Sequence, residues 1–492
     1  MNDNTLKPTL VCLINAAAYS RAYFEQLTPY LELHGYEVHY ALDSHLPDVL
    51  YAGGKTLSNA RYFTDYMQEN TAKGRKTRST NRYTWMPLFS DFDRFLTMDI
   101  RPPLIGGEPL QYADIPDLLD DFFTDITSKL RPVAFLYEPV SNSFASIAYE
   151  VSKRFGIPFC SLSPSRLPGR IELSLTGGQE VHLELASLLT KVQKGIVSEE
   201  SLAVASDYIA SIDSKTPDYM RTNGLDRIGL ARKYFNVGKV THFLRGIKYR
   251  IQYAKDCSIS YQYGNPIKIS LALFKRSLWR RLRIRRVLPC YTQPVKEEKY
   301  LLYPLHFHPE ASTSILAPDF IEELAVIKSI AFRLPTTHKL YVKEHPSAVA
   351  LQSIGFYKQI TAMPNVRLIG PNYPTKTLIR HSEGVICVTS TVGFEAAVLN
   401  KPVIILGNVF YAYFPNVKRI SDYSQLALAF QWLENYRIVS EADILNATAA
   451  YVEFGFPGKF DFKVSLNDPK ALTSVADLVA LRLKQNFKIS NV

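Results

Sequence analysis

The sequence predicts an α/β protein with two open parallel-sheet domains joined by a basic helical linker. Short β-branched and aromatic runs alternate with helical patterns in both halves of the chain, and neither half shows a short internal repeat. The length of 492 residues also favours two or three domains over one. Since ligands of open sheets bind at the carboxyl ends of the strands, we expect the two domains to face each other across a binding cleft.

The first half is predicted to contain two strand–helix–strand units, which favour parallel pairing with a right-handed crossover. The expected elements are a strand at 10–14, a helix over about 21–34, a strand at 37–42, a helix over about 115–130, a strand at 133–137, a helix over 143–155 and a strand at 159–162. The stretch 53–116 is less regular, and we expect loops and helices there. Helices around 185–212 close this half.

The second half shows the same alternation. The expected elements are a strand at 300–305, a helix over about 319–334, strands at 339–343 and 366–369, a helix near 375–381, a strand at 385–389, a helix over 393–399, a strand at 403–406 and a final helix over 468–485. The predicted boundaries are an N-terminal domain at 1–220, a basic linker at 221–296, a C-terminal domain at 297–430 and C-terminal helices at 431–492.

Composition excludes several classes of protein. Hydrophobic residues make up 47% and charged residues 21%, so the chain can bury cores and is not of a disordered type. No apolar run of 18 residues predicts a membrane-spanning helix, and the N-terminus lacks the pattern of a secretory signal. The five cysteines are scattered without a CxxC pair, which indicates neither a zinc site nor a disulfide framework. We therefore expect a cytoplasmic protein.

The basic excess lies in one segment. Residues 221–286 hold 17 Lys or Arg and two acids, whereas the whole chain has a net charge of +11. Within it, Phe274, Leu278 and Leu282 fall at helical spacing and arginines cover the other faces, a pattern typical of a helix at an anionic lipid surface. A solvated linker helix, a face for an acidic partner and a nucleic-acid surface remain alternatives.

Two motifs of the second half could hold a phosphate. His345 and Pro346 follow a predicted strand, and Lys343 is the last residue of that strand. We therefore expect a cation and an imidazole, oriented by the turn at Pro346, at this strand end. The hydroxyls of Thr389, Ser390 and Thr391, with Gly393, open a helix whose free N–H groups and dipole attract anions. Glu395 could accept hydrogen bonds from ribose hydroxyls. A structural turn and an ordinary N-cap are the alternatives.

Carboxylates at strand ends are candidates for sugar-transfer chemistry. Glu310 follows the first strand of the second half, and Glu138 ends a strand of the first half. Arg166 and Arg170 could pair with an acidic sugar or an acceptor phosphate. Each could also be an ordinary cap or surface charge. His306 and His308 have no third ligand in the sequence, so no metal site is predicted.

These motifs, in this order, resemble the capsule polysaccharide biosynthesis family, which includes bacterial β-Kdo transferases. The resemblance covers about residues 300–415 and is looser in the first half, at Tyr137-Glu138-Pro139. It is carried by His308-Pro309-Glu310 with Ser312-Thr313, by Leu340-Tyr341-Val342-Lys343-Glu344-His345-Pro346, by Thr389-Ser390-Thr391-Val392-Gly393-Phe394-Glu395-Ala396, and by Lys401-Pro402-Val403 with Gly407. The family often has Gln-Pro-Glu at the first block and Thr-Gly-Thr at the third.

The resemblance implies a GT-B fold of two Rossmann-like domains and a metal-independent transfer, with no cofactor beyond a CMP-activated sugar. It implies that the His-Pro and hydroxyl blocks hold the CMP phosphate and that Glu310 is the catalytic carboxylate. If the donor is CMP-Kdo and the product is β-linked, the reaction retains configuration. Glu310 would then be the nucleophile, His345 would protonate or stabilise the departing CMP, and Glu138 would be a base for the acceptor hydroxyl.

The resemblance further implies a polysaccharide or glycolipid acceptor at the cytoplasmic face of the inner membrane, and no nucleic acid. Three alternatives stay open. The chain could use another CMP-sugar or a UDP-sugar, it could be a non-catalytic GT-B-like scaffold in an export complex, or its basic segment could bind nucleic acid. The sequence names neither the acceptor nor the linkage, the oligomeric state or partner proteins.

Overall fold

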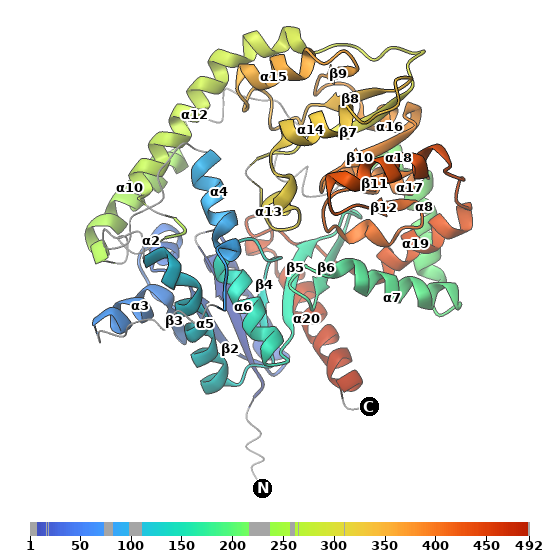
Figure 1. The fold of residues 1–492 in the computed structure, drawn as a ribbon. Coiled ribbons are helices and arrows are strands. Elements are labelled where there is room, and N and C mark those ends of the chain that lie inside the picture. The colour runs from blue at the N-terminus through green and yellow to red at the C-terminus, as the bar shows by residue number, and fades with distance from the viewer. Residues whose placement is uncertain are drawn as a thin grey trace. The chain divides into compact units, whose positions relative to one another are not determined.

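The computed structural model describes residues 7–15, 17, 19–72, 82–97, 111–215, 237–255, 261–263, 265–308 and 310–490. They form two compact units, each built around one sheet (Figure 1). The first unit takes its described residues from within Met1–Gln179, Gly229–Leu273 and Gly455–Val492. The second takes its described residues from within Glu180–Ile228 and Phe274–Phe454.

The sheet of the first unit has the order β13-β6-β5-β4-β1-β2-β3. Its strands are β1 (Thr9–Ile14), β2 (Glu37–Leu42), β3 (Ala60–Tyr62), β4 (Ala134–Tyr137), β5 (Phe159–Pro164), β6 (Arg170–Ser174) and β13 (Phe456–Pro457). Strands β1 to β5 pair in parallel, while β6 and β13 extend the sheet as antiparallel strands. The chain therefore reverses its direction of travel across the sheet between β1 and β4.

Helices cover this sheet. They are α1 (Ser20–Leu33), α2 (Leu46–Ala52), α3 (Phe63–Ala72), α4 (Phe89–Thr97), α5 (Gln111–Leu130), α6 (Ser143–Arg154), α10 (Val237–Gln252) and α20 (Pro469–Ser490), with the short 3-10 turns η1 (Met86–Leu88) and η7 (Ser465–Asn467). The C-terminal helix α20, drawn in red in Figure 1, lies beside the strands of this unit. Its Leu472, Val475 and Val479 are buried in the same core as Leu10 and Phe24.

The sheet of the second unit is entirely parallel, in the order β12-β11-β10-β7-β8-β9. Its strands are β7 (Tyr300–Pro304), β8 (Lys339–Lys343), β9 (Val366–Ile369), β10 (Gly384–Cys387), β11 (Val403–Ile405) and β12 (Val417–Arg419). The first strand lies at the centre, the next two extend to one side and the last three to the other. This is the Rossmann strand order, with its switch point between β7 and β10.

The helices of the second unit are α7 (Val181–Gln193), α8 (Glu199–Ala210), α13 (Ala311–Ser314), α14 (Glu323–Ala331), α15 (Ile354–Thr361), α16 (Thr375–His381), α17 (Thr391–Val398), α18 (Leu426–Glu434) and α19 (Glu441–Phe454). Its 3-10 turns are η2 (Ile212–Ser214), η3 (Leu288–Cys290), η4 (Pro318–Phe320), η5 (Phe410–Tyr413) and η6 (Tyr423–Gln425). Helix α12 (Pro266–Val287) begins in the first unit and ends in the second.

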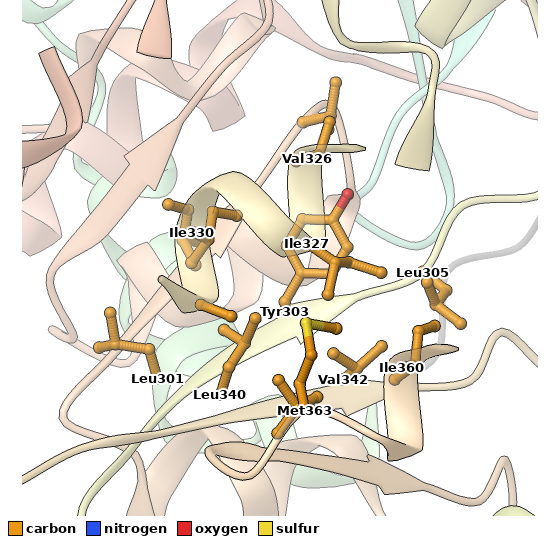
Figure 2. Packing of buried hydrophobic residues seen from close by; sticks show 14 of the residues in the cluster. Leu301, Tyr303, Leu305, Val326, Ile327, Ile330, Leu340, Val342, Ile360 and Met363 are labelled. Carbon is orange, nitrogen blue, oxygen red and sulfur yellow. The ribbon is translucent and has the colours of Figure 1, made fainter. Parts of the chain in front are cut away.

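Alternating strand residues build the core of the second unit. Figure 2 shows Leu301 and Tyr303 of β7 and Leu340 and Val342 of β8 beneath Ile327 of α14. Residues two apart on a strand point to the same face, so one face of each strand meets the helix. Burying a side chain of this size is favourable by about 1.5–3 kcal/mol, so this layer fixes where the strands end.

The predicted fold class is confirmed. Two Rossmann-like parallel-sheet units are present, and they fit the GT-B fold expected from the sequence. The expected facing of the two domains across a cleft stays a prediction. Sequence patterns missed the short strands β3, β6, β12 and β13, because runs of two to five residues carry too little periodicity.

The division of the chain differs from the predicted domain boundaries at 221, 297 and 431. Helices α7 and α8 contact α19 and thus belong to the second unit, and α20 returns to the first. The predicted linker is no separate body among the described residues, since α10 packs on α2 of the first unit and α12 continues into the second. The hydrophobic faces of these helices find their partners far away in sequence, which periodicity does not reveal.

Helix α12 has two different long faces within the second unit. Three arginines point inward and donate to backbone carbonyls: Arg276 to His308 O at 2.8 Å, Arg280 to Val349 O at 2.7 Å, and Arg283 to Leu351 O at 3.0 Å. The predicted apolar stripe instead faces outward. Phe274 is 65% exposed, Leu278 48% and Leu282 58%. No described helix is long and apolar enough to cross a membrane.

A buried ion pair in the first unit gives a test of its stability. Asp48 is completely buried; it accepts from Arg21 Nε at 2.8 Å and from Tyr62 Oη at 2.5 Å. Asp48→Ala leaves the buried guanidinium of Arg21 with only the half-exposed Glu25 as its counter-charge and removes the acceptor of Tyr62, so we expect a loss of about 3 kcal/mol in the free energy of unfolding, measured by urea denaturation. Lys129→Ala, which breaks an exposed pair with Asp125, should cost less than about 1 kcal/mol. Equal losses would contradict this assignment.

Candidate functional site

The candidate site lies at the switch point of the second sheet. Strands β7 and β10 are neighbours, but the connections that leave their carboxyl ends run in opposite directions. Residues 305–308 and 388–390 therefore leave the sheet in diverging directions, at the position where open α/β sheets bind their ligands. The loop after β8 begins beside them, at residue 344. Most of the predicted second-half motifs lie in these three loops.

His306 joins the two diverging loops. Its Nε2 accepts from the backbone N–H of Thr389 at 3.1 Å, so the ring hydrogen is on Nδ1 and is donated to Glu323 Oε1, also at 3.1 Å. The same oxygen accepts from the backbone N–H of His306 at 2.5 Å. Burial lowers the pKa of His306 to about 4 and raises the pKa of Glu323 to about 7. A largely uncharged pair thus fixes the spacing of the loops.

His308 has one paired and one unpaired nitrogen. Its Nδ1 lies 3.3 Å from Thr313 Oγ1, and that hydroxyl lies 2.9 Å from the carbonyl oxygen of Glu310. Its Nε2 is buried without a hydrogen-bond partner among the described residues. Burial lowers the pKa of His308, with a smaller opposing influence from Glu323, so the ring is neutral at pH 7.

Glu310 presents an exposed carboxylate shortly after the end of β7. It precedes the short helix α13, and its carbonyl accepts from the N–H groups of Thr313 and Ser314, both at 3.1 Å. The backbone of Glu310 is therefore fixed while its side chain reaches solvent. The predicted contact of this carboxylate with a ligand stays a prediction.

His345 is held as a neutral hydrogen-bond donor. Its backbone N–H donates to Glu344 Oε1 at 3.0 Å, and its Nδ1 accepts from the N–H of Ser347 at 3.2 Å. The ring hydrogen is then on Nε2. Burial, with His306 and Lys343 nearby, lowers the pKa of His345 to about 4. At pH 7 the ring can donate a hydrogen bond to a phosphate oxygen but carries no positive charge. Pro346 follows in the turn.

Glu344 supports His345 from behind. It is 1% exposed, and it accepts from the hydroxyl of Tyr291 at 3.0 Å as well as from the His345 backbone. Burial raises its pKa to about 7. A hydrogen-bonded carboxyl that stays partly protonated places less negative charge behind His345 than an ionised one.

Lys343 directs its ammonium toward backbone oxygens. Its Nζ donates to Pro371 O at 2.8 Å and to Glu344 O at 3.3 Å, and the residue is 3% exposed. Burial lowers its pKa to about 8. In this arrangement Lys343 joins the loops after β8 and β9, and its predicted contact with the donor stays a prediction.

The hydroxyl block begins helix α17 as predicted. Ser390 is the N-cap, and its Oγ accepts from the N–H of Val392 at 3.3 Å. Thr389 Oγ1 is buried with no partner among the described residues, and Thr391 is partly buried. A Cβ at Gly393 would collide with the hydroxyl of Tyr411, so this glycine serves close packing of the helix.

Glu395 lies on the flank of α17. Its carboxylate is 4.0 Å from Lys376 Nζ, and that ammonium also donates to Lys215 O at 2.6 Å. Burial raises the pKa of Glu395 to about 7 despite the opposing charge of Lys376. The predicted ribose contact is untested, while the ion pair with α16 is the contact that the structure describes.

The remaining candidates belong to the first unit. Glu138 follows β4 at the switch point of that sheet; its Oε1 accepts from Ser141 Oγ at 3.1 Å, and burial raises its pKa. Arg166 lies in the turn between β5 and β6 and is partly buried. Arg170 begins β6 and donates to Gly455 O at 2.9 Å, which favours a structural role next to β13. Their predicted roles toward a base or an acceptor stay predictions.

Sequence reasoning missed the supporting residues Glu323, Glu344, Tyr291 and Arg276. Glu323 comes 17 residues after its partner His306, at the start of another helix, and no spacing rule connects them. The only available signal was chemical, since acids that fall on buried positions demand partners. Among the described residues, no group of three His, Cys, Asp or Glu is arranged to hold a metal ion.

The raised pKa of Glu395 predicts a pH-dependent stability. In the unfolded chain this carboxyl ionises near 4.5, whereas its pKa in the folded protein is about 7. The folded state holds a proton that the unfolded state releases, so this group lowers stability as pH rises between these values. Glu395→Gln removes this effect. We expect the variant to gain on the order of 2–3 kcal/mol over wild type between about pH 5 and pH 8.

Urea unfolding of both proteins at several pH values measures the difference between their free energies of unfolding. The control is Glu434→Gln, which changes an exposed acid of the same unit. Its difference from wild type in the free energy of unfolding should not change with pH. A constant difference for Glu395→Gln would show that the carboxylate is charged in the folded state.

Comparison with known proteins identifies relatives of the second unit. Residues 283–434 match the family model of capsule polysaccharide biosynthesis protein. A stretch of 73 residues is 32% identical to capsule polysaccharide modification protein LipA of Neisseria meningitidis, in strains of serogroups A and B. That stretch is 15% of this chain and spans only 10% of LipA.

Among solved structures, two domains of Thermosulfurimonas dismutans KpsC are similar. The β-Kdo 2,4 transferase is 14% identical with a TM-score of 0.34, covering 64% of this chain and 79% of that one. The β-Kdo 2,7 transferase is 16% identical with a TM-score of 0.32, covering 73% and 89%. With TM-scores this low, neither alignment extends to the function of this chain. The family match covers the three loops of the candidate site, and residues 283–434 are therefore similar to the capsule polysaccharide biosynthesis family.

Proposed function

We propose that this chain is a glycosyltransferase of bacterial surface polysaccharide synthesis that transfers Kdo from CMP-Kdo to a polysaccharide or its lipid anchor. One observation carries the proposal. An exposed carboxylate (Glu310), a neutral imidazole donor (His345) and a hydroxyl-lined helix start (Thr389 to Thr391) occur in neighbouring loops at one switch point, within the family segment. These are the groups that a sugar phosphate ester requires of a transferase.

The phosphate of the donor would be held by hydrogen bonds. His345 Nε2–H and the hydroxyls of Ser390 and Thr391 supply donors without a fixed cation, and the N-terminus of α17 adds its helix dipole. Negative charge grows on the CMP phosphate as the glycosidic bond breaks, so these donors strengthen in the transition state. A CMP leaving group needs no protonation, which fits a His345 that is neutral at pH 7.

Net retention would follow from two displacements. A Glu310 oxygen forms a bond to the anomeric carbon while the bond to the CMP phosphate breaks and its electron pair leaves with CMP. The acceptor oxygen then replaces Glu310 at the same carbon, and its hydroxyl proton passes to a base. Glu138 is the proposed base from the first unit. Burial raises the pKa of this carboxyl above its ordinary value, which favours proton uptake.

A donor screen tests the proposal directly. The protein is incubated with CMP-Kdo, other CMP-sugars and UDP-sugars, and the free nucleotide is measured. Release from CMP-Kdo alone supports the proposal. Release from a different sugar nucleotide would reassign the donor, and binding without release from any of them would favour a non-catalytic scaffold.

Substitutions at Glu310 and His345 test the two central roles. Glu310→Gln removes the nucleophile and should lower turnover by at least about 10³-fold, while His345→Ala removes a phosphate donor and should cost about 10²-fold or more. The controls are Glu322→Gln and His381→Ala, exposed residues of the same unit. Turnover is followed by nucleotide release, and circular dichroism confirms folding. Wild-type turnover in either site variant would remove that role.

We also propose that the outer face of α12 lies on the anionic surface of the inner membrane, on its cytoplasmic side. Phe274, Leu278 and Leu282 are exposed on one stripe, Lys275, Arg281 and Arg285 flank them, and α12 contains no acid. An apolar stripe between cations suits the headgroup region of a bilayer better than nucleic acid, which offers no apolar layer.

Vesicle flotation tests this surface. We expect binding to vesicles containing phosphatidylglycerol, weaker binding to phosphatidylcholine alone and weakening by salt, because the cations act through a screened potential. Replacing Phe274, Leu278 and Leu282 together by Ser should reduce binding at least about tenfold. Leu428→Ser with Ile438→Ser removes exposed apolar residues elsewhere in the unit and should have no effect. Equal binding by both variants would refute the membrane surface.

A further inference from the structure

His308 offers a hydrogen-bond acceptor that nothing in the described structure occupies. The hydroxyl of Thr313 has one hydrogen, and the closer of its two neighbours is the Glu310 carbonyl at 2.9 Å. His308 Nδ1, at 3.3 Å, then donates its own hydrogen to Thr313 Oγ1. In a neutral ring this leaves Nε2 with a bare lone pair. That nitrogen is buried without a partner among the described residues, which is costly unless a ligand completes it.

A second unsatisfied atom belongs to the same switch point. Thr389 Oγ1 is also buried without a partner in the described part of the chain. His306 connects the two positions, because its Nε2 holds the Thr389 N–H at 3.1 Å and its ring centroid is 6.3 Å from that of His308. A Cβ at Gly407 would come within 2.5 Å of the Thr389 methyl carbon, so this glycine gives the Thr389 side chain its space.

The chemistry of these two atoms selects a hydroxyl group. A bare imidazole nitrogen needs a donor, and a phosphate diester oxygen has no hydrogen to give. A hydroxyl can donate to His308 Nε2 while it accepts from Thr389 Oγ1. On the proposed function, His308 lies two residues from the nucleophile Glu310, and Thr389 begins the block that faces the phosphate. The group between a nucleophile and the phosphate it displaces is the transferred sugar.

We propose that His308 is a specificity-determining residue whose Nε2 accepts a hydrogen bond from a hydroxyl of the transferred sugar. This rests on the proposed function for the identity of the ligand, although the state of the ring itself does not. His308 differs in this respect from His345, whose ring hydrogen is on Nε2 and points to an acceptor such as phosphate.

The state of the ring is tested without any substrate. Protein labelled with ¹⁵N-histidine is studied at pH 7 by two-bond ¹H–¹⁵N correlation, and the His308 signals are assigned by their absence from His308→Gln. We expect a neutral ring with hydrogen on Nδ1. Hydrogen on Nε2, or a protonated ring, would overturn the proposal even if the enzyme is an active transferase.

The ligand is tested by comparing CMP-Kdo with CMP, which lacks the sugar. His308→Ala should weaken binding of CMP-Kdo about tenfold and leave the affinity for CMP within about twofold, since one hydrogen bond of about 1.4 kcal/mol is lost. His308→Gln places an amide oxygen near the position of Nε2 and should recover most of the loss. His308→Asn reaches only the position of Nδ1 and should behave like Ala.

The outcomes separate this proposal from the function on which it rests. Equal losses for CMP-Kdo and CMP in His308→Ala would assign the residue to the nucleotide and refute it. Unchanged affinity for both would refute it as well. If the wild-type protein binds neither compound, the proposed function fails, and the tautomer measured by NMR still decides whether His308 presents an acceptor.

Discussion

The hydrogen bond from the Thr389 N–H to His306 Nε2 is the contact on which the candidate site depends. Strands β7 and β10 are neighbours, yet the chain leaves them in opposite directions, so nothing in the sheet itself fixes the distance between the two loops. His306 spans that gap, and Glu323 determines which ring nitrogen carries the hydrogen. His306 thus connects the two loops that carry the unpaired atoms of His308 and Thr389.

Charge is sparse in the interior of this site. His306 and His345 have pKa values lowered to about 4, Glu323 and Glu344 have values raised to about 7, and the Lys343 ammonium is directed at carbonyls. Burial is the largest cause in each case. On the proposed function, oriented neutral donors would stabilise developing negative charge without forming a tight ion pair with the product, so nucleotide release would not separate buried opposite charges.

The fold was predictable from sequence because β-branched runs and helical periods alternate clearly in both halves. The contents of the site were predictable in part. Glu310, His345 and Thr389 follow strands, and strand ends meet at one edge of a parallel sheet. The supporting partners were not predictable, since Glu323 and Tyr291 reach the site from other elements. The backbone partners of Lys343 and Arg170 were equally unpredictable, because spacing does not show that a cation near a motif donates to backbone oxygens.

Helix α12 binds backbone carbonyls in two of the three loops of the site, those after β7 and β8. Arg276 binds the carbonyl of residue 308, Arg280 that of residue 349, and Arg283 those of residues 351 and 352. Every residue has a backbone carbonyl, so these arginine hydrogen bonds do not depend on which side chains the loops carry. Substitution of the loop side chains can therefore change what the loops contact while the backbone course stays anchored.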